Sequence, residues 1–148
     1  MYYNVKYAET VPFVPPVKQG VVIKVYDGDT ITIASRLPIM PIEKQPIYRF
    51  SVRLNGIDTP EIKGKDDDEK QCAQRAKEYV SKMVMGKLVT LEDVQLEKYG
   101  RLLATVLTET GENLNELMVN CRYAVKYDGG TKVSPVSWQK YYDTGELE

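Results

Sequence analysis

Three short segments of this 148-residue chain gather charged or aromatic side chains around a glycine. They are residues 27–30 (DGDT), 53–61 (RLNGIDTPE) and 97–101 (EKYGR). Carboxylate oxygens bind hard cations such as calcium, and the planar guanidinium of arginine matches a phosphate. The chain has no histidine, which excludes Ser-His-Asp and Cys-His catalysis and HExxH-type zinc sites. Acid–base work in an enzyme would therefore fall to carboxylates, Lys, Tyr or Cys, helped by a metal.

The first segment has two interpretations. Asp27-Gly28 is typical of a hairpin turn, which is its simplest explanation. Asp29, however, shares strand parity with Ile31 and Ile33, so its carboxylate leans toward the apolar side of the sheet. A carboxylate there must lie at a barrel mouth, be paired, or bind a cation.

The second segment places Arg53, Asp58 and Glu61 at the end of a strand and around a turn. Asp29 and Asp58 could share one ion, and Arg53 could bind a phosphate. The alternative is a solvated loop with surface ion pairs. Arg53 lies opposite Val52 and Leu54 in parity, so we expect it to project freely out of the core.

The third segment brings Lys98, Tyr99 and Arg101 around Gly100. These side chains suit a phosphate and the face of a base or sugar, because Tyr stacks or donates while the cations pair. By itself the segment also reads as an ordinary basic turn. The acidic run 66–69 (DDDE) directly precedes a helical pattern, so we assign it to the helix N-terminus and not to a metal.

Hydrophobic periodicity predicts the elements that position these segments. Five strands are expected: one with Val21, Ile23 and Val25 on one face, one around residues 31–33, and others at 48–54, 88–94 and 102–108. A helix should cover residues 72–84, and a second should begin near Leu114 with Asn113 as its cap. The proline-rich stretch 37–47 predicts a long loop. This order matches a mainly β fold with helices, a five-stranded Greek-key barrel of the OB type with two or three helices.

Composition sets further expectations. The formal net charge of −1 argues mildly against a nucleic-acid binder, which is usually basic. Neither a membrane span nor a signal peptide is visible, so an intracellular, cytoplasmic protein that does not bind membranes is expected. Cys72 and Cys121 have no CxxC spacing and are expected to be reduced and buried.

Taken together and in this order, the segments resemble the staphylococcal nuclease (thermonuclease) family. The matching pieces are VIKVYDGDTITI, VRLNGIDTPE and EKYGRLLATVL, followed by NLNELMV, and they span about Gly20 to Lys126. The resemblance implies an OB-fold barrel. It also implies calcium-dependent hydrolysis of DNA and RNA, preferentially single-stranded, that leaves 3′-phosphate ends.

The resemblance also assigns roles by position. Asp29, Asp58 and the backbone carbonyl of Thr59 would hold calcium (Ca²⁺). Glu61 would orient or deprotonate the attacking water, and Arg53 and Arg101 would bind the scissile phosphate. Lys98 and Tyr99 would contact a neighbouring phosphate.

The chain departs from the family pattern at several places. Glu97 replaces the aspartate of the DKYGR motif, and the loop 37–47 is longer than usual. For the substrate-stacking tyrosine, Tyr123 and Tyr127 are both candidates, with Tyr127 better placed. The tail after Ser134 is too short for the family's long basic third helix.

We predict an N-terminal extension (1–19), a nuclease-like OB domain (20–132) and a C-terminal tail (133–148). Seven aromatic residues lie in the flanks: Tyr2, Tyr3, Tyr7, Phe13, Trp138, Tyr141 and Tyr142. At least one flank should pack on the barrel or mediate self-association, with a base-stacking platform as the alternative. Two other functions stay open: a non-catalytic OB-fold nucleic-acid-binding module and a protein-interaction domain.

Overall fold

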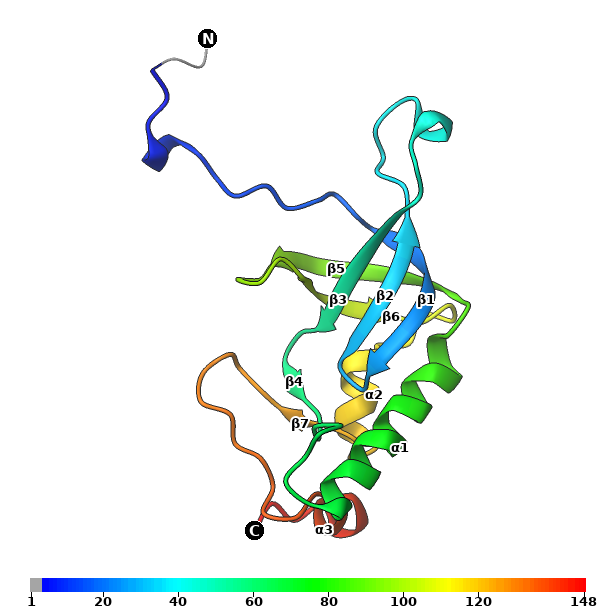
Figure 1. Ribbon diagram of the computed structural model, residues 1–148, viewed down its shortest axis with the longest axis vertical. Helices are drawn as coiled ribbons and strands as arrows, with labels where there is room; N and C mark the ends of the chain where they lie inside the picture. The colour runs from blue at the N-terminus through cyan, green and yellow to red at the C-terminus, as the bar shows by residue number, and fades with distance from the viewer. Residues whose placement is uncertain (1–3) are drawn as a thin grey trace.

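Five strands close into a barrel in the order β1-β2-β3-β6-β5 (Figure 1). The computed structural model describes residues 4–148. The barrel strands are β1 (Gln19–Asp27), β2 (Thr30–Ser35), β3 (Tyr48–Leu54), β5 (Leu88–Leu96) and β6 (Leu102–Leu107). Strands β3 and β6 pair in parallel, and the other neighbours pair antiparallel. The barrel and its helices confirm the predicted OB fold.

Three α-helices lie on the lower side of the barrel in the view of Figure 1: α1 (Asp67–Val84), α2 (Leu114–Asn120) and, at the bottom next to α1, α3 (Trp138–Thr144). The side chain of Asp66 caps α1 by accepting a hydrogen bond from the Glu69 N–H at 2.8 Å, so the acidic run serves the helix N-terminus as predicted. Asn113 caps α2 in the same way. Within residues 4–148, none of the helices is long and apolar enough to span a membrane.

Apolar side chains from every barrel strand, from α1 and from α2 form one core. In β1 the predicted inward face is wrong, because Val22 is fully buried while Val21 and Ile23 are exposed. The pairing of β1 with β2 shifts register between Val22 and Lys24, and such an irregularity reverses which side chains face inward. Val25 therefore points into the core after all.

A second, two-stranded sheet pairs β4 (Ile57–Asp58) with β7 (Val125–Lys126). Strands this short carry no periodicity that could predict them. Short 3₁₀ turns occupy Tyr7–Glu9 and Ile42–Lys44, the latter inside the proline-rich loop. Of these short elements, the β4–β7 sheet is the most important for the site, because it holds Asp58 beside the barrel.

The two flanks behave differently. Trp138 and Tyr141 of α3 are buried against Cys72 and Val125, and the Tyr141 hydroxyl donates to the Ala124 carbonyl at 2.8 Å. This confirms that one aromatic flank packs on the domain. The N-terminal segment extends away from the barrel and leaves Tyr7 and Phe13 exposed (Figure 1).

Several expectations about the flanks are left open. Tyr2 and Tyr3 lie outside the described residues. Self-association through the flanks and the boundaries at 19/20 and 132/133 stay predictions.

Both cysteines are free thiols. Cys72 is buried as expected, but the expectation is wrong for Cys121, which is exposed. Cys121 is the C-cap of α2, where the chain turns away from the core.

Candidate active site

The β1–β2 turn is a hairpin whose tip is buried. A Cβ added at Gly28 would lie 2.8 Å from the Ala76 Cβ of α1, so only glycine allows the turn to approach the helix this closely. Asp29 directly follows and is 8% exposed. The turn therefore holds a carboxylate in the interior, which an ordinary solvent-exposed hairpin would not do.

Arg53 pairs with this carboxylate. The β2–β3 register places Arg53 opposite Thr30, and its Nη2 lies 3.4 Å from Asp29 Oδ2 and 3.7 Å from Asp58 Oδ1. Its Nη1 donates to the carbonyls of Leu54 and Ile57. The prediction that Arg53 projects freely into solvent is wrong: it is 9% exposed, because the turn after β3 folds these acceptors around the guanidinium.

Asp58 is the most enclosed carboxylate of the site. The β4–β7 pairing sets it opposite Val125, and it is 4% exposed. Among the buried side-chain nitrogen and oxygen atoms of the described residues, Asp58 Oδ1 alone has no hydrogen-bond partner. Thr59, which follows it, is also buried. Arg53 and Lys132 lie 3.7 Å and 3.4 Å from this oxygen but donate no hydrogen bond to it, so it keeps capacity to bind a cation.

Sequence reasoning missed Lys132. Its Nζ lies 3.4 Å from Asp58 Oδ1 and 3.9 Å from Glu61 Oε1. Lys132 belongs to the irregular segment between β7 and α3, where no local pattern singles out one lysine. Glu61 itself is largely exposed, and its backbone N–H donates to Glu69 of α1 at 2.9 Å, which anchors the loop that carries it.

Asp27 is a second residue whose part in the site was not anticipated. Its Oδ1 accepts a hydrogen bond from the Asp29 N–H at 3.1 Å. Burial, together with the neighbouring Asp29, raises the pKa of Asp27 to about 7. Burial alone would also raise the pKa of Asp29, but hydrogen bonding with Asp27 and the charge of Arg53 outweigh it and lower that pKa. Near neutral pH, Asp29 is therefore ionised, whereas Asp27, with a pKa of about 7, is partly protonated.

The β5–β6 turn brings Arg101 to the same cluster. Its guanidinium Nε pairs closely with Glu97, and its Nη1 donates to Thr30 Oγ1 at 3.5 Å. Thr30 in turn donates to Asp29 Oδ1 at 3.0 Å. Hydrogen bonding with Glu97 raises the pKa of Arg101 further, so the group stays charged. Arg101 is thus connected to the Asp29–Arg53 pair through Thr30, from which 71 positions separate it in sequence.

The same turn presents Lys98 and Tyr99 to solvent. Tyr99 is 79% exposed, and the Lys98 Nζ lies 5.6 Å from its ring centroid. Within residues 4–148, Lys98 forms no ion pair with the carboxylates of the cluster.

The structure separates the two candidate tyrosines. The ring of Tyr127 lies 5.8 Å from Arg53 Cζ and 5.8 Å from Lys132 Nζ, so it borders the charged cluster. Tyr123 instead stacks between Tyr79 and Tyr142, with ring centroids 4.7 Å and 5.4 Å away. Tyr123 is therefore committed to packing within the domain, and Tyr127 is the one near the site.

Comparison with known proteins identifies the family. The profile described as "Staphylococcal nuclease homologue" matches residues 51–143, which include the second and third chemistry-bearing segments. This chain belongs to the staphylococcal nuclease family. An "Uncharacterized endonuclease" of Escherichia coli O157:H7 is 31% identical over 109 residues, which cover 74% of this chain and 61% of the relative. "Endonuclease YhcR" of Bacillus subtilis (strain 168) is 30% identical over 117 residues, covering 74% of this chain but 9% of the relative.

The chain thus spans about three fifths of the Escherichia coli relative and under a tenth of the Bacillus one. A third relative, "Protein ParB" of Escherichia coli, is 32% identical over 60% of this chain and 41% of its own length. The likeness therefore concerns the staphylococcal nuclease domain and not the remaining parts of these longer proteins.

This family uses calcium, and the residues of this chain show whether such an ion would fit here. In the part of the chain that the structure describes, no group of three or more His, Cys, Asp or Glu side chains is arranged to hold a metal by itself. The available donors are the buried carboxylates of Asp29 and Asp58 with the neighbouring Thr59 backbone. All are hard oxygen ligands, and Asp58 Oδ1 lacks a hydrogen-bond partner. This donor set fits calcium if waters or a substrate complete the coordination.

Proposed function

We propose that this domain is a calcium-dependent nuclease that hydrolyses phosphodiester bonds of DNA and RNA and leaves 3′-phosphate ends. The convergence of Asp29, Arg53 and Asp58, with Arg101 linked through Thr30, carries the proposal. Membership in the staphylococcal nuclease family and the endonuclease names of two relatives support it. Such a cluster combines oxygen ligands for a cation with two guanidinium groups for a phosphate.

Asp29, Asp58 and the Thr59 carbonyl would hold the calcium ion. Bound calcium would act as a Lewis acid that stabilises negative charge on the phosphoryl group. Arg53 is oriented in advance by two carboxylates and two carbonyls, so it is held in place before a phosphate binds. Arg101 reaches the cluster from the β5–β6 turn and would bind the same phosphate in the transition state.

Glu61 would orient and deprotonate the attacking water. Its carboxylate is exposed at the edge of the cluster, next to Lys132 and close in sequence to Asp58. Because the Glu61 carboxylate is exposed, it can contact water. The buried charges of Asp29, Arg53 and Asp58 do not depend on it as a partner. Its backbone hydrogen bond to Glu69 keeps the loop in place while the side chain stays free to receive a proton.

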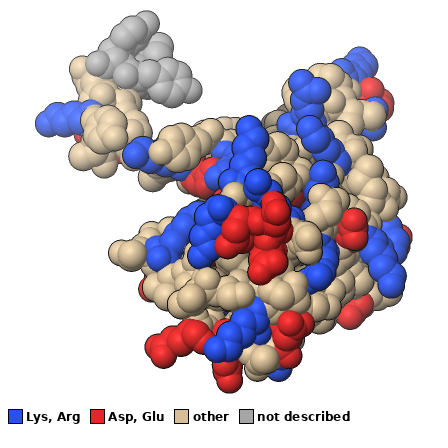
Figure 2. All heavy atoms as spheres, turned by 60° about the horizontal axis from the view of Figure 1, so that its bottom comes forward, with Lys and Arg blue, Asp and Glu red and all other residues tan. Residues whose placement is uncertain are grey.

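Lys98, Tyr99 and Tyr127 would bind the parts of the substrate next to the scissile phosphate. Tyrosine faces stack on unpaired bases, so single strands should be preferred over duplexes. On the face drawn in Figure 2, basic and acidic side chains are interspersed and do not form one broad basic surface. On this proposal the arginines and the cation supply positive charge locally, so few phosphates are neutralised and binding should weaken only modestly as salt is raised.

The decisive experiment is cleavage of single-stranded DNA and RNA with calcium added and then chelated. We expect calcium to start cleavage and chelation to stop it, with products whose 3′ ends become extendable only after phosphatase treatment. Glu61→Gln should lower the rate at least ~10²-fold while the fold is retained. Cleavage that continues in chelator would contradict the proposed site, and binding without any cleavage would favour the non-catalytic module.

Lys132→Ala should strengthen calcium binding. The Lys132 ammonium lies 3.4 Å from Asp58 Oδ1, so a divalent ion at that oxygen has to displace it. Because the lysine is half exposed, its pairing is expected to be worth about 1 kcal/mol or less, so the gain should be about 3- to 5-fold. Calorimetric titration with calcium measures it, and Lys126→Ala on β7 is the matched control. Unchanged or weaker binding in the Lys132 variant would show that the ammonium does not compete.

A further inference from the structure

The loop between β2 and β3, residues 36–47, projects beyond the end of the barrel and exposes large apolar side chains (Figure 1). Met40, in the middle of this loop, is 77% exposed. Single exposed apolar residues are ordinary, but a group of them in one loop marks an interaction surface. We call this group the apolar tip; its members are Ile39, Met40, Ile42, Ile47 and Tyr48.

The loop has a defined shape, because the side chain of Gln45 ties it together. Gln45 Oε1 accepts a hydrogen bond from the Leu37 N–H at 3.0 Å, and Gln45 Nε2 donates to the carbonyls of Leu37 and Ile39. Arg36 Nε donates to the Gln45 carbonyl at 3.4 Å. A loop held in this way loses little conformational entropy when it binds a partner.

The N-terminal segment leaves the barrel at the same end. Ser35, the last residue of β2, donates from Oγ to the Gln19 carbonyl at 2.7 Å, so the start of the loop lies against the start of β1. The segment before Gln19 also exposes the large apolar side chains Tyr7, Val11 and Phe13. Residues 4–18 and 35–49 together form the upper end of the molecule in Figure 1, which we call the loop end.

The loop end is basic although the chain as a whole is not. It contains five basic and two acidic residues, a net charge of +3 against −1 for the whole chain. All seven are exposed: Lys6, Lys18, Arg36, Lys44 and Arg49 with Glu9 and Glu43. Apolar side chains among basic ones complement a membrane surface, which offers hydrocarbon beneath negative headgroups. A nucleic acid would match the charge, but the aliphatic side chains of the tip have no ring on which its bases could stack.

The charged cluster lies at the other end of the same strand pair. Strands β2 and β3 pair from Thr30 opposite Arg53, at the cluster, to Ser35 opposite Tyr48, at the loop. The six residues of β2 span about 20 Å. A surface that binds the loop end therefore leaves the cluster open to water and to nucleic acid.

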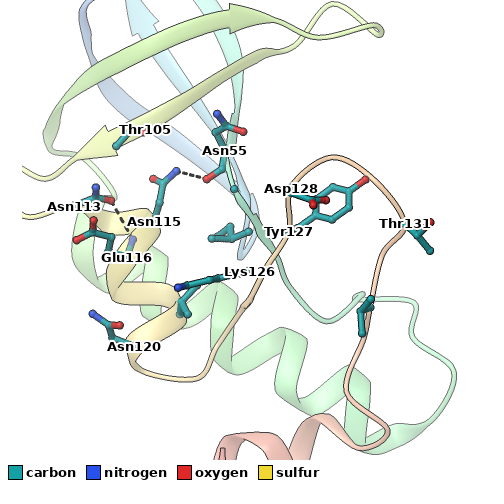
Figure 3. A pocket seen from close by; sticks show the side chains of 14 residues that line it. Asn55, Thr105, Asn113, Asn115, Glu116, Asn120, Lys126, Tyr127, Asp128 and Thr131 are labelled. Atoms are coloured by element: carbon teal, nitrogen blue, oxygen red, sulfur yellow. Dashed lines mark hydrogen bonds between the residues drawn. The ribbon is translucent and has the colours of Figure 1, made fainter. Parts of the chain in front are cut away.

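A pocket beside the cluster lies on the same side, away from the loop end. It has a volume of about 810 Å³, and Tyr127 and four asparagines are among its lining residues: Asn55, Asn113, Asn115 and Asn120 (Figure 3). Asn115 Nδ2 donates to the Asn55 carbonyl at 2.8 Å, which joins α2 to the turn after β3. None of the residues of the apolar tip lines this pocket, so the loop end is a separate surface.

We propose that the loop end binds the surface of an anionic membrane, with the apolar tip inserted among the headgroups. This binding is separate from the proposed nuclease activity and does not depend on it. It departs from the sequence-based expectation that the protein does not bind membranes, which considered only a spanning segment and a signal peptide. Binding at the surface requires neither.

Co-sedimentation with lipid vesicles tests the interaction. We expect the chain to bind vesicles of equal parts phosphatidylserine and phosphatidylcholine, and to bind phosphatidylcholine vesicles at least ~5-fold more weakly. The tip variant, which combines Ile39→Ser with Met40→Ser, should bind the mixed vesicles ~10-fold or more weakly, because two aliphatic side chains no longer leave water. Val136→Ser is the matched control, since Val136 is 69% exposed and lies just before α3.

Lys44→Gln tests the charge. It should weaken binding to the mixed vesicles ~5-fold and leave binding to phosphatidylcholine vesicles unchanged. Lys82→Gln, at an exposed position in the last turn of α1, is the matched control.

Met40→Trp reports insertion directly. The single tryptophan of the chain, Trp138, is buried in α3, so its emission should not respond to vesicles. In the Met40→Trp variant we expect a shift of emission to shorter wavelength on the mixed vesicles, and quenching by lipids with brominated acyl chains. Wild-type protein is the control for both signals.

Four outcomes would overturn the proposal. They are no binding to the mixed vesicles, equal binding by the tip variant and the wild type, no change in Met40→Trp emission, and dimerisation without vesicles that only the tip variant loses. The last result would mean that a second copy covers the tip. Cleavage of free single-stranded DNA should be the same in the tip variant and the wild type. A chain that binds vesicles through the tip but does not cleave DNA would contradict the nuclease proposal alone.

Discussion

Replacing Arg53 with alanine is expected to lower kcat/KM on single-stranded DNA by about 10³-fold, the effect of removing a group that stabilises transition-state charge. The same change should lower the free energy of unfolding by about 3–5 kcal/mol at neutral pH. No other substitution in this domain should affect both quantities so strongly. Cleavage kinetics and urea denaturation measure the two effects separately.

The stability loss follows from the surroundings of Arg53. Its guanidinium lies between the buried carboxylates of Asp29 and Asp58, and without it those charges face each other with only Lys132 near Asp58. Leaving buried charges uncompensated is what makes breaking such a pair costly. The loss should shrink at acid pH, because Arg53 helps to hold the pKa of Asp29 below its usual value and a protonated Asp29 no longer needs the guanidinium.

Two further variants test this explanation. Arg53→Lys keeps the charge but not the planar fork, so it should recover more stability than turnover. Arg49→Ala lies on the same strand with the same parity and is exposed, so it should change neither quantity strongly. Equal losses in the Arg49 and Arg53 variants would contradict the assigned role, as would full activity in Arg53→Ala.

Replacing Arg101 with alanine is expected to lower kcat about 10²- to 10³-fold while reducing stability by about 1 kcal/mol or less. Arg101 is more exposed than Arg53 and pairs with Glu97 at the β5–β6 turn, so the fold depends less on it. Its hydrogen bond to Thr30 places it beside Asp29, where charge would develop on a phosphate.

Lys98→Ala is the comparison for Arg101→Ala. Lys98 lies on the same turn but is exposed and touches Tyr99 rather than the buried cluster. We expect a few-fold rise in KM, a smaller salt dependence and little change in kcat. Steady-state kinetics at two salt concentrations distinguishes these effects. If the two variants lose turnover equally, the division between transition-state and substrate-binding residues is incorrect.

Local sequence signals predicted most elements of the fold. Alternation identified the barrel strands, and the caps Asp66 and Asn113 lie at the helix starts that their residue types indicated. The same signals failed in β1, because a register shift is set by the partner strand and not by the strand's own pattern. They also missed β4 and β7, whose two-residue length leaves no period to detect.

The three motif segments likewise named most residues that the structure brings together. Asp29, Arg53 and Asp58 do meet, and Arg101 reaches them through Thr30. Burial of Arg53 was not foreseen, because parity says which side of a strand a residue faces and not what the following turn places over it. Lys132 was not predicted, because its position depends on a loop without regular structure.

By itself the sequence determined the kinds of chemistry open to this protein. Without histidine, the available groups are carboxylates, guanidinium groups and a cation that oxygen ligands can hold, and three segments in order showed the family. Only the tertiary structure decided which tyrosine borders the charged cluster, that the pKa of Asp27 is raised to about 7 while that of Asp29 is lowered, and that an asparagine-lined pocket adjoins Tyr127. Those properties arise from groups far apart in sequence and from their burial, and neither is encoded in any local pattern.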